Sequence, residues 1–335
     1  MKGLWIFLFL SFSVDAALPS RVTPNLYFID AHSQMDHRVD EERVISLMDH
    51  GGVYRTFLSS HLKRDPLEIV SFSKEYPDRI LPSVIIKGKG YQRKHRSRFS
   101  ARLAKQANNS DFKAMAEVLI WHDSMGGQFQ EVRTDFDDDQ VLEALKVAKH
   151  KGWPFIVHIE FNSLSDDDRK SYMNKLKTFL NTNPKQPVIL IHMAQLESDS
   201  VKALLDEFPN VYFMTSHATN KGKSGKPFIN MFKYQRLTPQ WKRLIVEYPE
   251  HFIFALDMVF SKWWVPRKYL KKEMSLWWKG LSELPDEVAH AVAHGNAERL
   301  WNVEPKPEDV EMYPPWITKK TMGSVTGYSA NRGKK

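Results

Sequence analysis

The chain contains no cysteine among its 335 residues, and this absence limits the chemistry that it can perform. It excludes disulfides, thiolate metal ligands, cysteine nucleophiles and thiol-based redox sensing. Any bound metal must therefore be held by histidine, carboxylate or amide groups. A chain of this length can bury a hydrophobic core large enough to be stable without disulfides.

Long apolar segments are also scarce. A short apolar run at residues 4–12 follows Lys2, and small or branched residues around Ala16 come next, which is the layout of a secretory signal peptide. We interpret residues 1–17 as a signal peptide, with an uncleaved anchor as the alternative, and expect a secreted or periplasmic protein. No later apolar run is long enough to cross a bilayer, so we expect no stable membrane span in the mature chain.

The sequence lacks a glycine-rich turn of the kind that binds dinucleotides, and it lacks internal repeats. The glycine-containing lysine loop that begins at Lys87 is not a phosphate loop, because it does not have the GxxxxGK[ST] arrangement. The net charge of +8 is compatible with an anionic partner. No nucleic-acid-binding motif accompanies this charge, so we expect no nucleic-acid partner, and the oligomeric state is not indicated.

Short apolar segments alternate with helical patterns through most of the chain. The segments expected to be strands are 26–30, 53–58, 80–86, 117–122, 155–160, 188–193, 211–216 and 252–257. Alternation of this kind predicts parallel strands joined by helical crossovers, and eight such units predict an α/β fold, a closed (βα)₈ TIM barrel with outer helices, over residues 22–310. Gly295 is expected to end a helix and Asn296 to cap the next one. Residues 311–335 are expected to form a basic C-terminal tail.

Titratable side chains stand at the ends of several predicted strands, where a barrel places its active site. His32 follows the first strand, His158 and His192 belong to the fifth and sixth, and Asp257 ends the eighth. Barrel closure would bring three imidazoles and one carboxylate together, a set that suits a divalent metal, with zinc the expected one. A buried carboxylate is costly unless it is paired or coordinated, which favours a function for Asp257.

These residues, together with IDAHSQ at 29–34 and HGNAERLW at 294–301, resemble the amidohydrolase superfamily, in particular its amidohydrolase-related branch of hydrolases and decarboxylases. The resemblance implies that His32 and His158 bind a metal and that His192 binds metal or polarises the substrate's carbonyl group. It further implies that Asp257 binds metal and takes the proton from the attacking water. The activity implied is hydrolysis of a C–N or C–O bond.

Gln34 departs from the His-x-His pattern that the family usually has on the first strand. A glutamine amide offers only a neutral oxygen, which is a poorer zinc ligand than imidazole. Three alternatives follow. The metal has other ligands, with His122 and His217 as candidates; the enzyme is metal-independent, as a lactonase or a decarboxylase could be; or the barrel is a secreted binding protein without catalysis.

Basic and aromatic residues in the loops after three strands predict a small anionic substrate with a ring to stack on. The basic residues after the third strand are Lys87, Lys89, Arg93, Lys94, Arg96 and Arg98, and those near the eighth are Lys262 and Arg267. The residues predicted to contact substrate are Arg55, His122, His217, Trp263 and Trp264. Arg55 could instead form a structural ion pair. Asp30 is expected to orient an imidazole or to cap a loop.

Overall fold

The computed structural model describes residues 22–88, 91, 96–124, 126–127, 129–219, 228–264 and 267–317. The predicted signal peptide at 1–17 and most of the predicted basic tail lie outside the described residues, as do Lys89, Arg93 and Lys94. None of the helices among the described residues has the length and apolar character needed to cross a membrane.

The predicted strands are present and parallel, and each pairs with its neighbour along the chain. They are β1 (Phe28–Asp36), β2 (Val53–His61), β3 (Ile80–Val84), β4 (Ala114–Met115), β5 (Val118–His122), β7 (Phe155–Ile159), β8 (Val188–Leu190), β9 (Val211–Met214) and β12 (Phe252–Ile253). Three further short strands, β6 (Val132–Arg133), β10 (Phe232–Lys233) and β11 (Arg236–Leu237), form antiparallel pairs. β4 and β5 are two parts of the fourth predicted strand: β4 pairs with β3, and β5 pairs with β7.

The four-stranded sheet β1-β2-β3-β4 and the six-stranded sheet β12-β9-β8-β7-β5-β6 are joined on both sides. On one side, β4 continues into β5 through Ala116 and Glu117, and the amide of Ala116 extends the pairing with β3 by donating to the carbonyl of Val84 at 2.9 Å. On the other side, the amide of Ala31 donates to Phe254 at 3.1 Å, and that of Gln34 donates to Met258 at 2.7 Å. These bonds join the first strand to the segment after the last one, which is the connection that a barrel requires.

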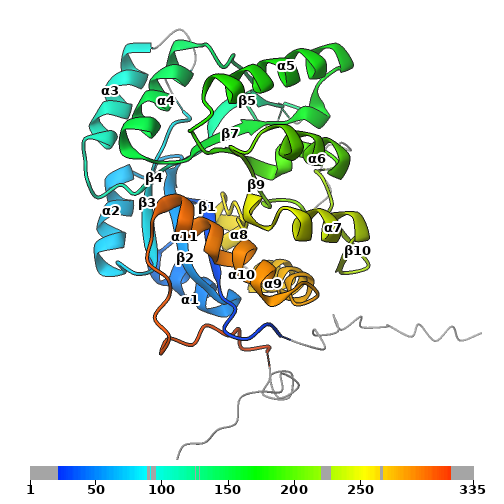
Figure 1. Cartoon of the computed structure of the whole chain (residues 1–335). Helices are drawn as coiled ribbons and strands as arrows, with labels where there is room; N and C mark the ends of the chain where they lie inside the picture. Colours follow the sequence, from blue (N-terminus) through cyan, green and yellow to red (C-terminus); the bar gives the residue numbers. More distant parts are fainter. Residues whose placement is uncertain are drawn as a thin grey trace, which may run out of the picture.

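Helices surround the strands (Figure 1). They are α1 (Glu41–Gly51), α2 (Pro66–Glu75), α3 (Arg96–Ala107), α4 (Asp139–Lys151), α5 (Asp166–Thr182), α6 (Ser198–Glu207), α7 (Pro239–Glu247), α8 (Ser261–Trp264), α9 (Arg267–Leu281), α10 (Asp286–His290) and α11 (Asn296–Trp301). Helix α4 begins after Asp138 and ends at Gly152, which has the left-handed conformation that glycine favours at a helix C-terminus.

The prediction for the last helices was wrong. Gly295 does not end a helix: its φ is −58°, and a π-helical turn over Ala291–Gly295 joins α10 to α11. Asn296 does not cap α11 either, because its side-chain amide donates to the carbonyls of Pro249 and Phe252, both at 2.8 Å. These bonds attach the final helix to the beginning of the last strand.

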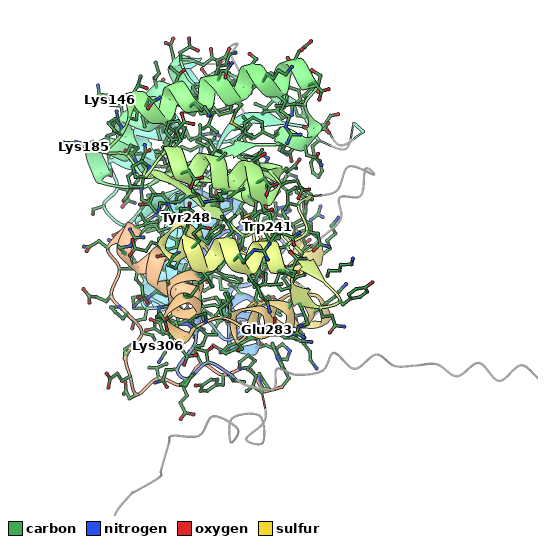
Figure 2. All side chains as sticks on the ribbon, turned by 45° about the vertical axis from the view of Figure 1, so that its right-hand side comes forward. Lys146, Lys185, Trp241, Tyr248, Glu283 and Lys306 are labelled. Atoms are coloured by element: carbon green, nitrogen blue, oxygen red, sulfur yellow. The ribbon has the colours of Figure 1, made fainter. Side chains whose placement is uncertain are left out.

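The hydrophobic core lies between the strands and the surrounding helices, and charged side chains lie outside it. Figure 2 shows Lys146 on α4 and Lys185 in the turn after α5 at the surface, and both are exposed. Trp241 of α7 is 1% exposed. Burial of such large side chains supplies most of the driving force for folding.

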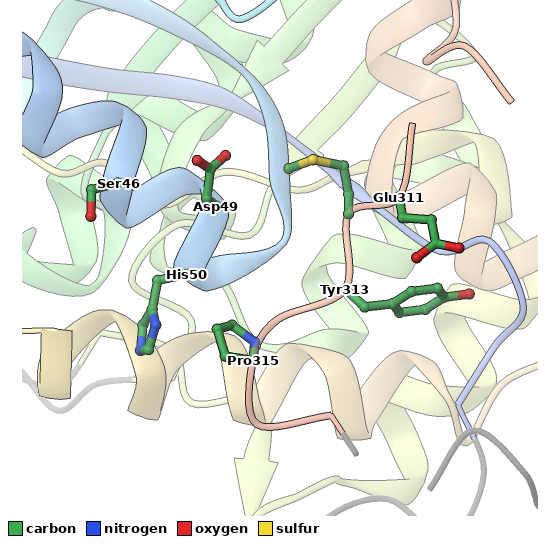
Figure 3. A pocket seen from close by; sticks show the side chains of 7 residues that line it. Ser46, Asp49, His50, Glu311, Tyr313 and Pro315 are labelled. Carbon is green, nitrogen blue, oxygen red and sulfur yellow. The ribbon is translucent and has the colours of Figure 1, made fainter. Parts of the chain in front are cut away.

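A hollow of about 410 Å³ lies between α1 and the segment 311–315. Asp49, His50, Glu311 and Tyr313 are among its lining residues (Figure 3). The end of α1 leads directly into the beginning of β2, so this hollow is at the amino-terminal end of the strands. It is therefore remote from the end where the candidate catalytic residues were predicted.

Gly52, next to this hollow, is expected to be sensitive to substitution. Gly52 and Gly152 both follow a helix and both have positive φ, +73° and +67°. A Cβ at Gly52 would lie 2.8 Å from the Met312 carbonyl and 2.8 Å from the Trp278 ring, whereas a Cβ at Gly152 would have no described heavy atom within 4 Å.

We expect Gly152→Ala to lower the free energy of unfolding by about 1 kcal/mol, through backbone strain alone. Gly52→Ala adds steric overlap and is expected to cost about 3 kcal/mol. Denaturant unfolding of the two variants measures the difference. Equal losses would show that the segment around Met312 does not pack against α1 as described.

Candidate active site

Polar side chains from six of the parallel strands meet at the carboxyl ends of the barrel strands. They are His32 and Gln34 in β1, Glu117 between β4 and β5, His158 in β7, His192 after β8, His217 after β9 and Asp257 after β12. All but His217 are less than 9% exposed, and His217 is partly exposed. All four residues predicted from the sequence as catalytic or metal-binding, His32, His158, His192 and Asp257, thus lie in one cluster.

Asp257 is surrounded by imidazoles. Its Oδ2 lies 3.0 Å from His217 Nε2 and 3.6 Å from His192 Nε2, and its Oδ1 lies 3.5 Å from His32 Nε2. Burial alone would raise the pKa of this carboxyl group, but His217 and His192 outweigh burial and hold the pKa of Asp257 well below its usual range. Asp257 is therefore ionised at neutral pH.

Glu117 is a second buried carboxylate with three donors around it. Its Oε1 accepts a hydrogen bond from Lys87 Nζ, and its Oε2 lies 2.6 Å from His158 Nδ1. The amide nitrogen of Gln34 lies 3.3 Å from the same Oε1. Burial would raise the pKa of Glu117, but Lys87 and His158 hold it well below the usual range.

His158 lies between two carboxylates. Besides the contact with Glu117, its Nε2 lies 3.4 Å from Oε1 of Glu160, a residue that is 1% exposed. Burial lowers the pKa of an imidazole, but Glu117 and Glu160 prevail and raise the pKa of His158 to about 10. The pKa of Glu160 is lowered to about 2, against the effect of burial, by the bond to His158.

His192 has a different environment from His158. Its Nδ1 lies 2.8 Å from the Ser216 hydroxyl, so its Nε2 faces the cluster. Burial and the neighbouring His217 lower the pKa of His192 to about 3. A neutral imidazole with its lone pair directed at a carboxylate-rich cluster is the form that binds a metal.

The backbone at the strand ends is strained. His192, His217 and Asp257 have positive φ values of 56°, 58° and 50°, and the turn after β8 keeps φ positive from His192 to Gln195. Non-glycine residues in this conformation cost free energy and persist only where the surroundings impose them. The strain turns these side chains toward the centre of the cluster, and it coincides with three of the residues that define the site.

Two buried carboxylates of the site, Glu117 and Glu160, were not singled out in the sequence. Each stood at an end of a predicted strand, 117–122 or 155–160, and only the histidines of those strands were considered. The fourth strand starts earlier, at Ala114, so Glu117 lies inside it rather than at its start. The signal that could have identified Glu117 and Glu160 is a carboxylate within an apolar run, which is the same signal that favoured a function for Asp257.

Asp30 is buried and joins three parts of the site's scaffold. Its carboxylate accepts hydrogen bonds from the Ser33 hydroxyl at 2.5 Å, the Thr56 hydroxyl at 2.9 Å and the Leu256 amide at 2.8 Å. The His32 amide also donates to it, at 3.3 Å. Asp30 therefore positions the backbone of His32 and of the residue before Asp257, and its hydrogen bonds within the described residues go to hydroxyl and amide groups rather than to an imidazole ring.

Two predictions of substrate contact are corrected by the structure. Arg55 lies in the first half of β2, where its guanidinium donates to the carbonyls of Asp78 and Glu304, so the structural interpretation of Arg55 holds. Trp264 is 3% exposed, and its indole donates to the carbonyl of Gln34 at 2.9 Å. Trp264 therefore stabilises the backbone of β1, whereas Trp263 is partly exposed and contacts His217.

The cluster has the donor set of a metal site. The ligand atoms of His192, His217 and Asp257 lie within 4.8 Å of one another, and so do those of Glu117, His158 and His192. The separations of 3.0–3.6 Å around Asp257 are close to the roughly 3.3 Å that separates two ligands of one tetrahedral zinc ion. His122 joins a third such group with His158 and Glu160, so both alternative ligands predicted for the metal, His122 and His217, lie in the cluster.

Aromatic rings form a closed circuit around the cluster, each ring 4.7–6.0 Å from the next. In order, they are His158, His122, Phe129, Phe260, Trp263, His217 and His192. Lys262 lies over the rings of Phe260 and Trp263 at 5.1 and 5.9 Å. This circuit of rings favours contact with a planar group of a ligand, which can stack on the ring faces.

The sequence and the fold were compared with known proteins. The sequence model of the family described as Amidohydrolase matches residues 92–303, which is more than half of the chain. No curated protein sequence matches the chain.

Solved structures with a similar fold are TIM barrels. One is an uncharacterized TIM-barrel protein from Bordetella bronchiseptica, with 15% identity, a TM-score of 0.54, and coverage of 78% of this chain and 82% of that chain. A 2,6-dihydroxybenzoate decarboxylase has 13% identity and a TM-score of 0.53, with 83% and 98% covered. The 5-carboxyvanillate decarboxylase of Novosphingobium aromaticivorans, solved with bound manganese, has 11% identity and a TM-score of 0.53, with 83% and 97% covered. At these identities the likeness shows the fold.

The scaffold around Asp30 generates a stability prediction. Asp30→Asn places the side-chain NH₂ group against the hydroxyl and amide donors that now bond the carboxylate, so we expect the free energy of unfolding to fall by about 3 kcal/mol or more. Thr56→Val removes only one of the donors and should cost about 1 kcal/mol. Chemical denaturation compares the two. A loss for Asp30→Asn no larger than that for Thr56→Val would contradict the central position assigned to this carboxylate.

Proposed function

Because the chain belongs to the amidohydrolase family, we propose that it is a metal-dependent hydrolase acting on a C–N or C–O bond of a small anionic substrate. The observation that carries the proposal is the carboxylate of Asp257 with three imidazole nitrogens 3.0–3.6 Å away. Nitrogen and oxygen ligands at such separations suit zinc, and they also suit other divalent transition metals. The proposed ligands are His32, His192, His217 and Asp257.

A divalent cation held there would supply Lewis acidity to water and to the substrate's carbonyl group. The carboxylate of Asp257 is ionised, and its Oδ2 lies 3.0 Å from His217 Nε2. Its Oδ1 accepts a hydrogen bond from the Gln34 amide at 3.3 Å, and a second lone pair of Oδ1 can accept a proton from water. His158 carries the positive charge that its two carboxylates stabilise, and it can donate a hydrogen bond to the oxygen that becomes negative.

The substrate is proposed to be a small organic anion with a planar group. The closed circuit of rings supports the planar group, and Lys262 on the rim, together with the basic residues predicted in the loops, supports the negative charge. Decarboxylation of an aromatic acid is the second candidate, which the same circuit favours and which matches the names of two structural neighbours. Export is part of the proposal and rests on the layout of residues 1–17.

Metal content tests the proposal without knowledge of the substrate. We expect the purified mature chain to retain a divalent cation, and we expect Asp257→Asn and His217→Ala to weaken its binding about tenfold or more, because each removes a ligand. Elemental analysis after gel filtration measures bound metal. His251→Ala is the matched control, because His251 stacks on Tyr212 away from the cluster.

A metal-free wild type whose activity resists chelators would refute the metal-dependent mechanism and favour a metal-independent lactonase or decarboxylase. A wild type that binds metal and shows no turnover would favour the binding protein. Release of carbon dioxide from a carboxylated aromatic substrate would identify the decarboxylase.

The ring circuit makes a separate prediction about ligands. Trp263→Ala and Phe129→Ala should each weaken binding of benzoate about tenfold, which corresponds to roughly 1.4 kcal/mol of lost stacking. Binding of cyclohexanecarboxylate, which is not planar, should change less. Leu142→Ala is the control, since Leu142 is 45% exposed on α4. Equal effects on both acids would contradict selection of a planar group by the circuit.

A further inference from the structure

Of the three overlapping places for a cation in the cluster, two share His192. One is framed by Glu117, His158 and His192, and the other by His192, His217 and Asp257. The two places share His192, whose Nδ1 is engaged with the Ser216 hydroxyl at 2.8 Å. A single lone pair, on Nε2, therefore serves both places, and a second cation would depend on Glu117 and His158.

The oxygens of Glu117 already have donors. Lys87 Nζ donates a hydrogen bond to Oε1, and the Gln34 amide donates to the same oxygen at 3.3 Å. His158 Nδ1 lies 2.6 Å from Oε2. A lysine ammonium group has three donors and no lone pair, so it competes with a metal for a carboxylate and cannot act as a ligand itself.

Lys87 reaches into the cluster from its edge. Its side chain is 23% exposed, whereas that of Glu117 is 2% exposed. A carboxylate so deeply buried requires a compensating positive charge, and Lys87 supplies it from the turn that follows β3. The contact also spans 30 residues of sequence, so it joins the segment after β3 to the fourth barrel strand.

Asp257 has no comparable partner. In the part of the chain that the structure describes, the ion pairs of Asp257 are with His32, His192 and His217, and none is with a lysine or arginine. Its charge is thus compensated only by groups that can themselves bind a metal. Glu117 and Asp257 are thus satisfied in different ways.

We propose that Lys87 occupies the place of a divalent cation beside Glu117, and so reduces by one the number of metal ions that this barrel binds. The inference rests on the proposed function in that both concern the same cluster. It assigns to Lys87 a positioning role: the lysine fixes Glu117, and through Glu117 the ring of His158, without taking a metal.

The test is the difference in bound metal between Lys87→Met and the wild type. Each protein is stripped with a chelator, reloaded with zinc, passed through a gel-filtration column and measured by elemental analysis. Lys87→Met is expected to bind one more zinc ion per chain than the wild type. Lys87→Arg retains the positive charge and is expected to bind the same number as the wild type.

Two further variants make the result specific. Lys113→Met removes an exposed lysine whose ammonium donates to the Ser110 carbonyl at 3.2 Å, and it should leave the zinc content unchanged. The double variant Lys87→Met/Glu117→Gln should lose the additional ion, because the carboxylate that would hold it is gone. If Lys87→Met fails to fold, Lys87→Gln tests the same point with a neutral side chain that still donates a hydrogen bond.

The outcomes separate the two proposals. The zinc content of the wild type tests the metal-dependent function, and a metal-free wild type would refute that function alone. The difference between Lys87→Met and the wild type tests the inference about Lys87. A gain of one ion that Glu117→Gln abolishes supports the inference; no gain, or a gain that survives Glu117→Gln, overturns it.

Discussion

The burial of carboxylates at one end of the barrel is the constraint on which the site depends. Glu117, Glu160 and Asp257 are each at most 4% exposed, and an isolated buried carboxylate would be very costly. The protein compensates these charges with imidazoles and one lysine, and the resulting shifts in pKa differ from residue to residue. His158 gains a proton between two carboxylates, whereas His192, because it is buried and lies beside another imidazole, is neutral.

Backbone strain and hydrogen bonding hold this arrangement together. His192, His217 and Asp257 all occupy the left-handed region, which few residues adopt without a reason. Asp30 counteracts part of this cost, since it fixes the amides of His32 and Leu256 at the same level of the barrel. Stability and site geometry are therefore coupled: the residues that close the barrel between its first and last strands also place the candidate ligands.

The fold and half of the site follow from the sequence, because barrel closure needs only the order of strands and the polarity of their ends. His32, His158, His192 and Asp257 could be placed together on that basis. Glu117 and Lys87 could not be paired, since their contact depends on how the interrupted fourth strand lies against the turn after β3. Trp264 and Arg55 were wrongly predicted to contact substrate from their residue type alone. The indole of Trp264 donates to the backbone carbonyl of Gln34, and the guanidinium of Arg55 donates to the carbonyl of Asp78.

Gln34 shows why a departure from a family pattern need not mean loss of function. Its amide nitrogen lies 3.3 Å from Glu117 Oε1 and 3.3 Å from Asp257 Oδ1, so one NH₂ group can donate to both carboxylates. A neutral imidazole has one N–H and could donate to only one of them. Trp264 holds the backbone carbonyl of Gln34 in place. Glutamine at this position thus connects Glu117, which Lys87 neutralises, with Asp257 without adding a charge, whereas an imidazole could donate to both carboxylates only in its protonated form.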